Sequence, residues 1–267
     1  MCYNLWECLQ EEGARVRRFF VSEIDEHAEA LARERALGLE LICFCDARRL
    51  EDGDVIRAQA ARLEGLTGRA MHAPYFELSP CAIVPLIRAV AMYRMRQAAQ
   101  VCAQIGARRM IVHSGYAPQV YFPEWFVPKS IEFWRELLDG LPGDFELMVE
   151  NVLDVGPEPM RAVCDGVDDP RLRICLDVGH ANAYSPVTVE AWISMLGGRI
   201  AHVHLHNNDG LRDLHAPLDE GSLDVERVLR HLDAYAPAAD ICIESVDALS
   251  CIRTLEKRGV ITDEKSL

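Results

Sequence analysis

Short apolar runs alternate with longer amphipathic segments along the whole chain. Eight of the short runs have the aliphatic and β-branched content that is typical of buried strands: Arg18–Ser22, Leu39–Cys45, Arg69–His72, Arg109–His113, Glu146–Glu150, Arg173–Asp177, Ala201–His206 and Asp240–Glu244. Between them, a helical spacing of apolar residues predicts helices such as Val55–Leu66, Ile83–Ile105, Ser130–Leu138, Val187–Leu196 and Val225–Leu232. Left-handed caps are expected where glycine follows a helix, at Gly38, Gly106 and Gly198.

This alternation predicts an α/β fold with a parallel sheet and helices outside it. Eight strands in 267 residues fit a closed (β/α)8 barrel. An open doubly wound sheet is the alternative, but no glycine-rich phosphate loop follows the first strand and polar residues stand at many strand ends. Since no linker divides the chain, residues 1–267 are predicted to form a single domain.

The charge balance narrows the choice of partners. Lys+Arg number 28 against 42 Asp+Glu, a net charge of −14, which lacks the broad basic footprint of nucleic-acid binders. Nucleic acid is therefore a less favoured partner, although a local basic groove stays compatible. No apolar run could span a bilayer and the start of the chain lacks the apolar core of a secretion signal, so a cytoplasmic protein without a membrane partner is expected. The 10 cysteines form no CxxC pair and are predicted to be reduced thiols.

Histidine and acidic residues, the candidates for metal binding or catalysis, stand at the ends of several predicted strands. His72, His113, Glu150, Asp177 and Glu244 stand at the ends of the third, fourth, fifth, sixth and eighth predicted strands. Strand ends of a barrel converge on one mouth, and carboxylates buried together there cost several kcal/mol each unless a counter-charge is present. Few Lys or Arg stand at these ends. A divalent cation would supply the charge, and imidazole with carboxylate is a ligand set for zinc or manganese.

The seventh strand adds three histidines in alternation. Period two places His202, His204 and His206 on one face, so they are predicted to line the lumen at increasing height. His204 is the expected ligand, while His202 lies too deep and His206 is placed for a supporting or substrate contact. Asp213 and His215 follow, and either they join the site or they lie in an ordinary exposed loop.

The chain resembles the xylose isomerase-like TIM-barrel superfamily in a series of motifs: His-Ala-Pro-Tyr, His-Ser-Gly, Glu-Asn, Asp-x-Gly-His, His-Leu-His-Asn-Asn-Asp-Gly, Asp-x-His and a final strand Glu. The resemblance runs from about Leu39 to Glu244. It is more specific for fold and metal than for substrate. The superfamily includes sugar and sugar-phosphate isomerases and epimerases, and the endonuclease IV-type enzymes (AP endonuclease family 2) that act on abasic DNA.

The resemblance implies one of two ligand sets. In the isomerase and epimerase branch, one manganese, magnesium or cobalt ion would be held by Glu150, Asp177, His204 and Glu244. In that branch Glu150 and Glu244 would also move protons, and His180 would contact a substrate oxygen. In the endonuclease branch, up to three zinc ions would be held by those four residues together with His72, His113, His180, Asp213 and His215. All nine positions carry the expected residue type.

A metal-dependent sugar or sugar-phosphate isomerase or epimerase is the favoured function. The acidic chain suits a small polyol substrate, and Glu150 and Glu244 could take and return a proton beside a metal-chelated carbonyl. The alternative is a zinc-dependent phosphoester hydrolase resembling endonuclease IV. The complete ligand set supports it, whereas the mouth loops are poor in the Lys and Arg that contact DNA. A metal-stabilised binding protein without catalysis is a third hypothesis.

Other residues are candidates for specificity. Substrate contacts are predicted at Asn151, His206 and Trp125. The segment Tyr116–Phe126 is either an aromatic lid or a surface loop pinned by its own aromatic side chains. An N-terminal group that could cover the barrel bottom or join the interface of a homo-oligomer comprises Tyr3, Leu5 and Trp6.

Overall fold

A computed structural model describes residues 17–262, whose strands form a closed barrel in the order β1 to β8, each parallel to both neighbours. The strands are β1 (Phe19–Ser22), β2 (Gly38–Leu41), β3 (Arg69–His72), β4 (Arg109–His113), β5 (Glu146–Glu150), β6 (Leu172–Asp177), β7 (Ile200–Leu205) and β8 (Asp240–Ile243). The predicted TIM barrel is confirmed, and these elements form a single domain.

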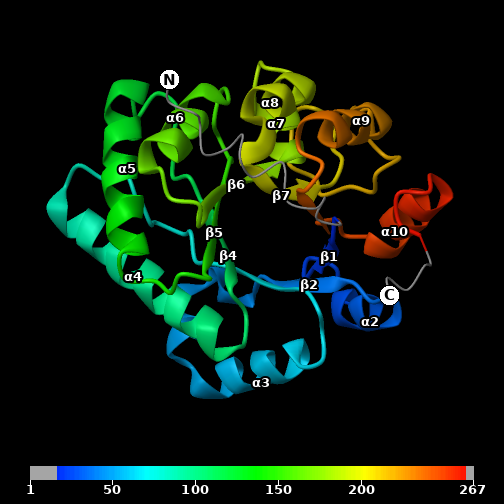
Figure 1. Cartoon of the computed structure of the whole chain (residues 1–267), viewed down its shortest axis with the longest axis horizontal. Coiled ribbons are helices and arrows are strands. Elements are labelled where there is room, and N and C mark those ends of the chain that lie inside the picture. The colour runs from blue at the N-terminus through cyan, green and yellow to red at the C-terminus, as the bar shows by residue number, and fades with distance from the viewer. Residues whose placement is uncertain (1–16, 263–267) are drawn as a thin grey trace.

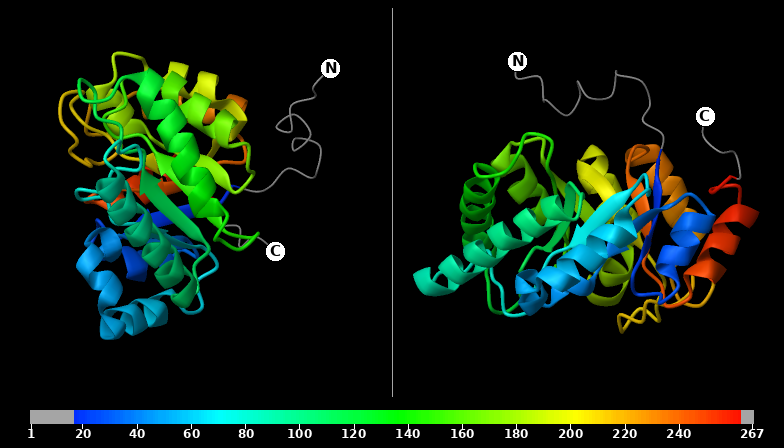
Figure 2. Two further views of the ribbon diagram at one scale, coloured as in Figure 1. Left: turned by 90° about the vertical axis from the view of Figure 1, so that its left-hand side faces the viewer. Right: turned by 90° about the horizontal axis from the view of Figure 1, so that it is seen from below.

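Helices form an outer layer around the strands, as Figures 1 and 2 show. They are α2 (Ala28–Glu34), α3 (Gly53–Leu63), α4 (Pro85–Gln104), α5 (Pro123–Leu138), α6 (Glu158–Val167), α7 (Val178–Tyr184), α8 (Val189–Leu196), α9 (Val225–Tyr235) and α10 (Ala248–Lys257). Short 3-10 turns lie at Cys43–Cys45, Ala47–Glu51 and Gly197–Arg199. Between residues 17 and 262, no helix combines the length and the apolar character needed to cross a membrane.

Two apolar clusters fill the molecule on either side of the strands. The large cluster joins the helices to the outer face of the barrel and includes Leu39 and Leu41 of β2. The small cluster fills part of the lumen and consists of Phe20, Ala70, Ile111, Met148, Cys175, Ala201 and Cys242. Because strand side chains alternate, Glu40 lies on the face opposite its two leucine neighbours. The lumen therefore contains a polar layer as well as an apolar one.

Two predicted elements differ from the structure by four or more residues at one end. The strand predicted over Leu39–Cys45 ends at Leu41, because the Glu23 carboxylate accepts hydrogen bonds from the backbone amides of residues 42 and 43 and the chain turns there. The helix predicted over Ser130–Leu138 begins earlier, at Pro123. Proline is favoured in the first turn of a helix, where its missing N–H leaves no partner unsatisfied.

The predicted glycine caps are right at one position of three. Gly106 follows α4 with φ +77°. Gly38 is instead a strand residue, and a Cβ there would lie 2.3 Å from the Phe20 ring, so close packing explains this glycine. The positive φ predicted for Gly198 occurs one residue earlier, at Gly197.

The prediction of reduced cysteines agrees with the structure over the described residues. Each cysteine that the structure describes is a free thiol. Tyr3, Leu5 and Trp6 lie outside the described residues, and their role stays a prediction.

Candidate metal centre

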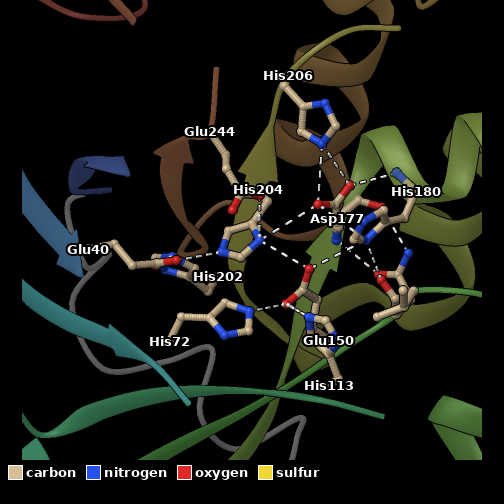
Figure 3. A network of polar contacts seen from close by, with 12 residues as sticks. Glu40, His72, His113, Glu150, Asp177, His180, His202, His204, His206 and Glu244 are labelled. Atoms are coloured by element: carbon tan, nitrogen blue, oxygen red, sulfur yellow. Dashed lines mark hydrogen bonds and ion pairs between the residues drawn. The ribbon is translucent and has the colours of Figure 1, made fainter. Parts of the chain in front are cut away.

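Four of the predicted ligands meet at the C-terminal mouth of the barrel (Figure 3). Glu150 and Asp177 are the last residues of β5 and β6, His204 lies near the end of β7, and Glu244 follows β8. One donor atom of each lies within 4.8 Å of those of the other three, and all four side chains are buried. We call these residues the central group.

The distances within the central group fit a divalent ion. His204 Nδ1 lies 3.0 Å from Glu244 Oε2, 3.3 Å from Glu150 Oε1 and 3.7 Å from Asp177 Oδ2. Four ligand atoms placed about 2.1 Å from a zinc ion at tetrahedral angles are about 3.4 Å apart. Carboxylate oxygens and an imidazole nitrogen are also suitable ligands for zinc, manganese or magnesium. Both the separations and the donor set of the central group therefore suit such an ion.

The electrostatics of the central group favour positive charge. Burial alone would raise the pKa of Glu150, but the His204 imidazole, together with hydrogen bonds from His180 and His204, outweighs it and holds that pKa well below its usual range. The pKa of Asp177 is lowered in the same way, mainly by His180. Burial opposes charge on His204 as well, yet the anionic groups around it raise its pKa well above the usual range. Glu150 and Asp177 are therefore ionised and attract either protons on the histidines or a cation.

A first flanking group shares Glu150 with the central group. Its second oxygen, Oε2, lies 3.0 Å from His72 Nε2 and 3.7 Å from His113 Nε2. Tyr75 stacks on the His113 ring with centroids 4.1 Å apart. Burial lowers the pKa of His113 to about 3, and a neutral imidazole is the form that binds metal. Each oxygen of Glu150 thus faces a different group of donors.

A second flanking group lies beyond Asp177. Asp213 Oδ2 is 2.9 Å from His215 Nε2 and 3.3 Å from His180 Nε2. His206 Nε2 lies 3.2 Å from Asp177 Oδ1 and 3.7 Å from Asp213 Oδ1, and its supporting or substrate role stays a prediction. Within residues 17–262, the buried Asp213 Oδ1 has no hydrogen-bond partner. Asp213 and His215 therefore lie against His180, beside the central group, and their role as ligands stays a prediction.

Backbone carbonyls orient three of these histidines. Nδ1 lies 2.9 Å from the carbonyl of residue 73 in His72, of residue 151 in His180 and of residue 244 in His215. A carbonyl only accepts hydrogen bonds, so each Nδ1 carries a proton and each Nε2 faces the site as a potential ligand. His215 adopts this position with φ +46°, a backbone conformation that is uncommon outside glycine.

Asn151 is held by backbone contacts. Its Nδ2 donates to the carbonyl of Asp177 and its Oδ1 accepts from the amide of Asp177, both at 2.9 Å. The side chain therefore ties β5 to the end of β6. Both polar atoms of the side chain thus contact the backbone of Asp177, and the substrate contact predicted for Asn151 stays a prediction.

The aromatic segment after β4 is partly fixed and partly exposed. Tyr116 and Phe126 are buried and pack edge to face with ring centroids 4.9 Å apart. Tyr121 is tied to Ser79 by a 3.0 Å hydrogen bond between their hydroxyls. Trp125 lies at the start of α5 with 52% of its surface exposed, outside the three donor groups. The buried contacts agree with a pinned loop, and the substrate contact predicted for Trp125 stays a prediction.

Glu40 is a residue of the site region that the pattern of strand ends did not predict. This fully buried carboxylate lies with Oε2 2.9 Å from His202 Nε2 and Oε1 3.0 Å from His204 Nε2. His202 is therefore deeper than the central group, as predicted. The signal for Glu40 was present in the sequence, because an acidic residue between two leucines of a short strand must face the lumen when those leucines face the helices.

A family model described as xylose isomerase-like TIM barrel matches residues 23–255. An uncharacterized protein of Methanocaldococcus jannaschii, MJ1311, is 25% identical over 197 residues, which cover 70% of this chain and 67% of the relative. A probable endonuclease 4 of Mycobacterium leprae is 27% identical over 187 residues, or 66% of this chain and 70% of the relative.

Solved structures show the same fold. A D-tagatose 3-epimerase-like protein superposes with a TM-score of 0.75 at 21% identity and covers 94% of this chain and 100% of its own. The TTHB071 protein of Thermus thermophilus, soaked with ZnCl2, has a TM-score of 0.71 at 24% identity and covers 91% of this chain and 96% of its own.

Proposed function

Because this chain belongs to the xylose isomerase-like TIM barrel family, we propose that it is a metal-dependent isomerase or epimerase of a small polyol, such as a sugar or sugar phosphate. The arrangement of Glu150 and Glu244 around His204 Nδ1, at 3.3 and 3.0 Å, carries the proposal. A divalent ion held by the central group would polarise a carbonyl oxygen of the substrate.

The two glutamates supply the proton transfers. Glu150 is ionised, since its pKa lies well below the usual range, and it can accept a proton from a carbon next to the carbonyl. Glu244 follows β8, on the other side of His204, and in its protonated form could deliver a proton to the opposite face of that carbon. Inversion then leaves Glu150 protonated and Glu244 ionised, and exchange of protons with solvent restores both.

His180 is placed to donate to a substrate oxygen. Its burial is outweighed by Asp177 and its other acidic neighbours, which raise its pKa well above the usual range. Its Nδ1 is bound to a backbone carbonyl, so a proton on Nε2 points toward the site. The structural neighbour described as D-tagatose 3-epimerase-like supports a sugar substrate through its fold.

Phosphoester hydrolysis is the second candidate. The Nε2 atoms of His72, His180 and His215, which face the site, favour it because they suit a site with up to three zinc ions. The endonuclease 4 relative supports the same chemistry. A DNA duplex is less favoured as the substrate, since mouth arginines Arg48 and Arg212 are paired with Asp46 and Asp209 at 2.7 and 2.8 Å.

Two assays separate these functions. We expect protein loaded in turn with manganese, magnesium, cobalt or zinc to exchange a carbon-bound proton of a ketose or its phosphate for deuterium, as followed by proton NMR. An oligonucleotide with one abasic site should stay intact under the same conditions. Cleavage of the oligonucleotide without any exchange into a panel of ketoses would overturn the isomerase proposal in favour of the hydrolase. Glu150→Gln is the control that should abolish either activity.

A further inference from the structure

Buried polar contacts cross the barrel below the central group. Arg109 Nη1 lies 3.0 Å from His202 Nδ1, and His202 Nε2 lies 2.9 Å from Glu40 Oε2. Glu40 Oε1 in turn faces His204 Nε2 at 3.0 Å, as Figure 3 shows. All four side chains are at most 2% exposed. Since β8 and β1 separate β7 from β2 in the barrel, Glu40 reaches across the lumen to both histidines.

The contact between Arg109 and His202 determines where the protons of these side chains lie. A guanidinium group only donates hydrogen bonds, so His202 Nδ1 accepts from Arg109 and the proton of His202 is on Nε2. The carboxylate of Glu40 only accepts, so it receives that hydrogen bond on Oε2 and presents Oε1 to His204. In the described part of the chain, Glu40 Oε1 and His204 Nε2 are buried without an aligned hydrogen-bond partner. Each is the nearest partner of the other, at 3.0 Å, and the oxygen stabilises a proton on Nε2 when an ion occupies Nδ1, which faces the Glu150 and Glu244 carboxylates.

His204 differs from the other histidines of the site. His72, His180 and His215 place Nδ1 on a backbone carbonyl and turn Nε2 to the site. His204 does the reverse, with Nδ1 toward the carboxylates and Nε2 toward Glu40. The Glu40 carboxylate therefore takes the place of the backbone carbonyl.

A second ion between Glu40, His202 and His204 is disfavoured, although their donor atoms are close together. The Arg109 guanidinium is 3.0 Å from His202 and is itself held by Asp240 at 2.7 Å. A fixed positive charge at this distance repels another cation in a buried site.

We propose that Glu40 is a positioning residue, which keeps the proton of His204 on Nε2 and so leaves Nδ1 free to bind the ion. The inference rests on the metal site of the proposed function. Arg109 keeps the proton of His202 on Nε2, and His202 donates it to Glu40 Oε2, so Oε1 of Glu40 remains for His204. An imidazole binds metal through its unprotonated nitrogen, and removal of a group that holds a ligand in this way lowers metal affinity about 10- to 100-fold.

The variant Glu40→Gln gives a specific prediction for proton placement. The amide of glutamine has one accepting oxygen and one donating nitrogen. Arg109 keeps His202 as a donor from Nε2, so the amide oxygen must turn to His202 and the NH2 group to His204. His204 Nε2 must then accept, and its proton moves to Nδ1, where it blocks the ion.

Nitrogen NMR follows the proton of His204 when zinc is bound. In the zinc-loaded wild type, long-range 1H–15N correlation should show His204 bound to the ion through Nδ1 and protonated on Nε2, and Glu40→Gln should lose this pattern at the same zinc concentration. The same pattern in both proteins would overturn the inference alone. A wild type that binds no zinc would instead overturn the proposed function together with this inference, so the two failures are distinguishable.

Zinc affinity, measured by competition with a chelator, tests the consequence. Glu40→Gln should bind zinc about 10- to 100-fold more weakly than the wild type. The control is Asp25→Asn, which removes a buried carboxylate that accepts hydrogen bonds from the backbone amides of residues 27 and 248, and it should bind zinc as the wild type does. Adding His202→Leu to Glu40→Gln frees the amide oxygen to turn to His204, and affinity should recover. A merely structural role for Glu40 predicts a further loss in the double variant, and equal affinity of Glu40→Gln and wild type would also overturn the inference.

Discussion

Glu150→Gln should remove most of the stability that the protein gains from zinc. Glu150 faces the central group with Oε1, 3.3 Å from His204, and the first flanking group with Oε2, 3.0 Å from His72. The amide keeps the size of the side chain but removes one of the three carboxylate charges of the central group. The substitution therefore weakens two groups of donors at once.

The magnitude follows from ligand linkage. Groups that only support a ligand contribute about 10- to 100-fold to metal affinity, so the loss of the ligand charge itself should reduce affinity by about 100-fold or more. Zinc at about 100 times its dissociation constant adds about 2.7 kcal/mol to the free energy of unfolding. For a protein of about this size, 1 kcal/mol shifts Tm by about 2–4 °C. The wild type should thus gain about 5–10 °C with zinc, and Glu150→Gln should gain little.

Differential scanning calorimetry with zinc and with chelator measures this gain for each protein. The comparison within one variant cancels any effect of the substitution on the metal-free state. Asp154→Asn is the matched control, because Asp154 is a buried carboxylate close to Glu150 in sequence but outside the three donor groups. If Glu150→Gln kept the full zinc-dependent rise in Tm, Glu150 would not be a ligand and the central group as described would be wrong.

Three further predictions concern other parts of the molecule. Burial raises the pKa of Asp154 to about 6, so the native state holds this proton more tightly than the unfolded chain does. The free energy of unfolding should therefore fall by about 3 kcal/mol as pH rises from about 4 through 6. Urea unfolding of Asp154→Asn should lack this dependence on pH. Asp213→Asn should weaken the binding of zinc beyond the first equivalent by about 10-fold or more, while the first equivalent stays tightly bound. If the calorimetric titration were unchanged, the second flanking group would not be a zinc site. Gly38→Ala should cost about 1–3 kcal/mol in chemical denaturation, because its Cβ would lie 2.3 Å from Phe20, whereas Gly143→Ala, with open space around it, should unfold like the wild type.

The sequence by itself determined the barrel and most of the site. Strand–helix alternation specifies a parallel sheet, and in a closed parallel barrel every strand ends at the same mouth. Residues at strand ends, such as Glu150 and Asp177, therefore had to meet although they are far apart in the chain. Alternation along β7 likewise placed His202 deeper than His204 without any knowledge of distances.

Only the tertiary structure decided how each of these side chains acts. The register shift between β6 and β7 sets the height of the β7 histidines, and nothing in a single strand encodes it. Whether Nδ1 or Nε2 of a histidine faces the site depends on which partner stands behind the ring, a carbonyl for His215 or the carboxylate of Glu40 for His204. These partners come from distant parts of the chain, and side-chain hydrogen bonds depend on distances and angles that local periodicity does not carry. For the same reason the sequence did not reveal that the Asn151 amide binds the backbone of Asp177 in the neighbouring strand.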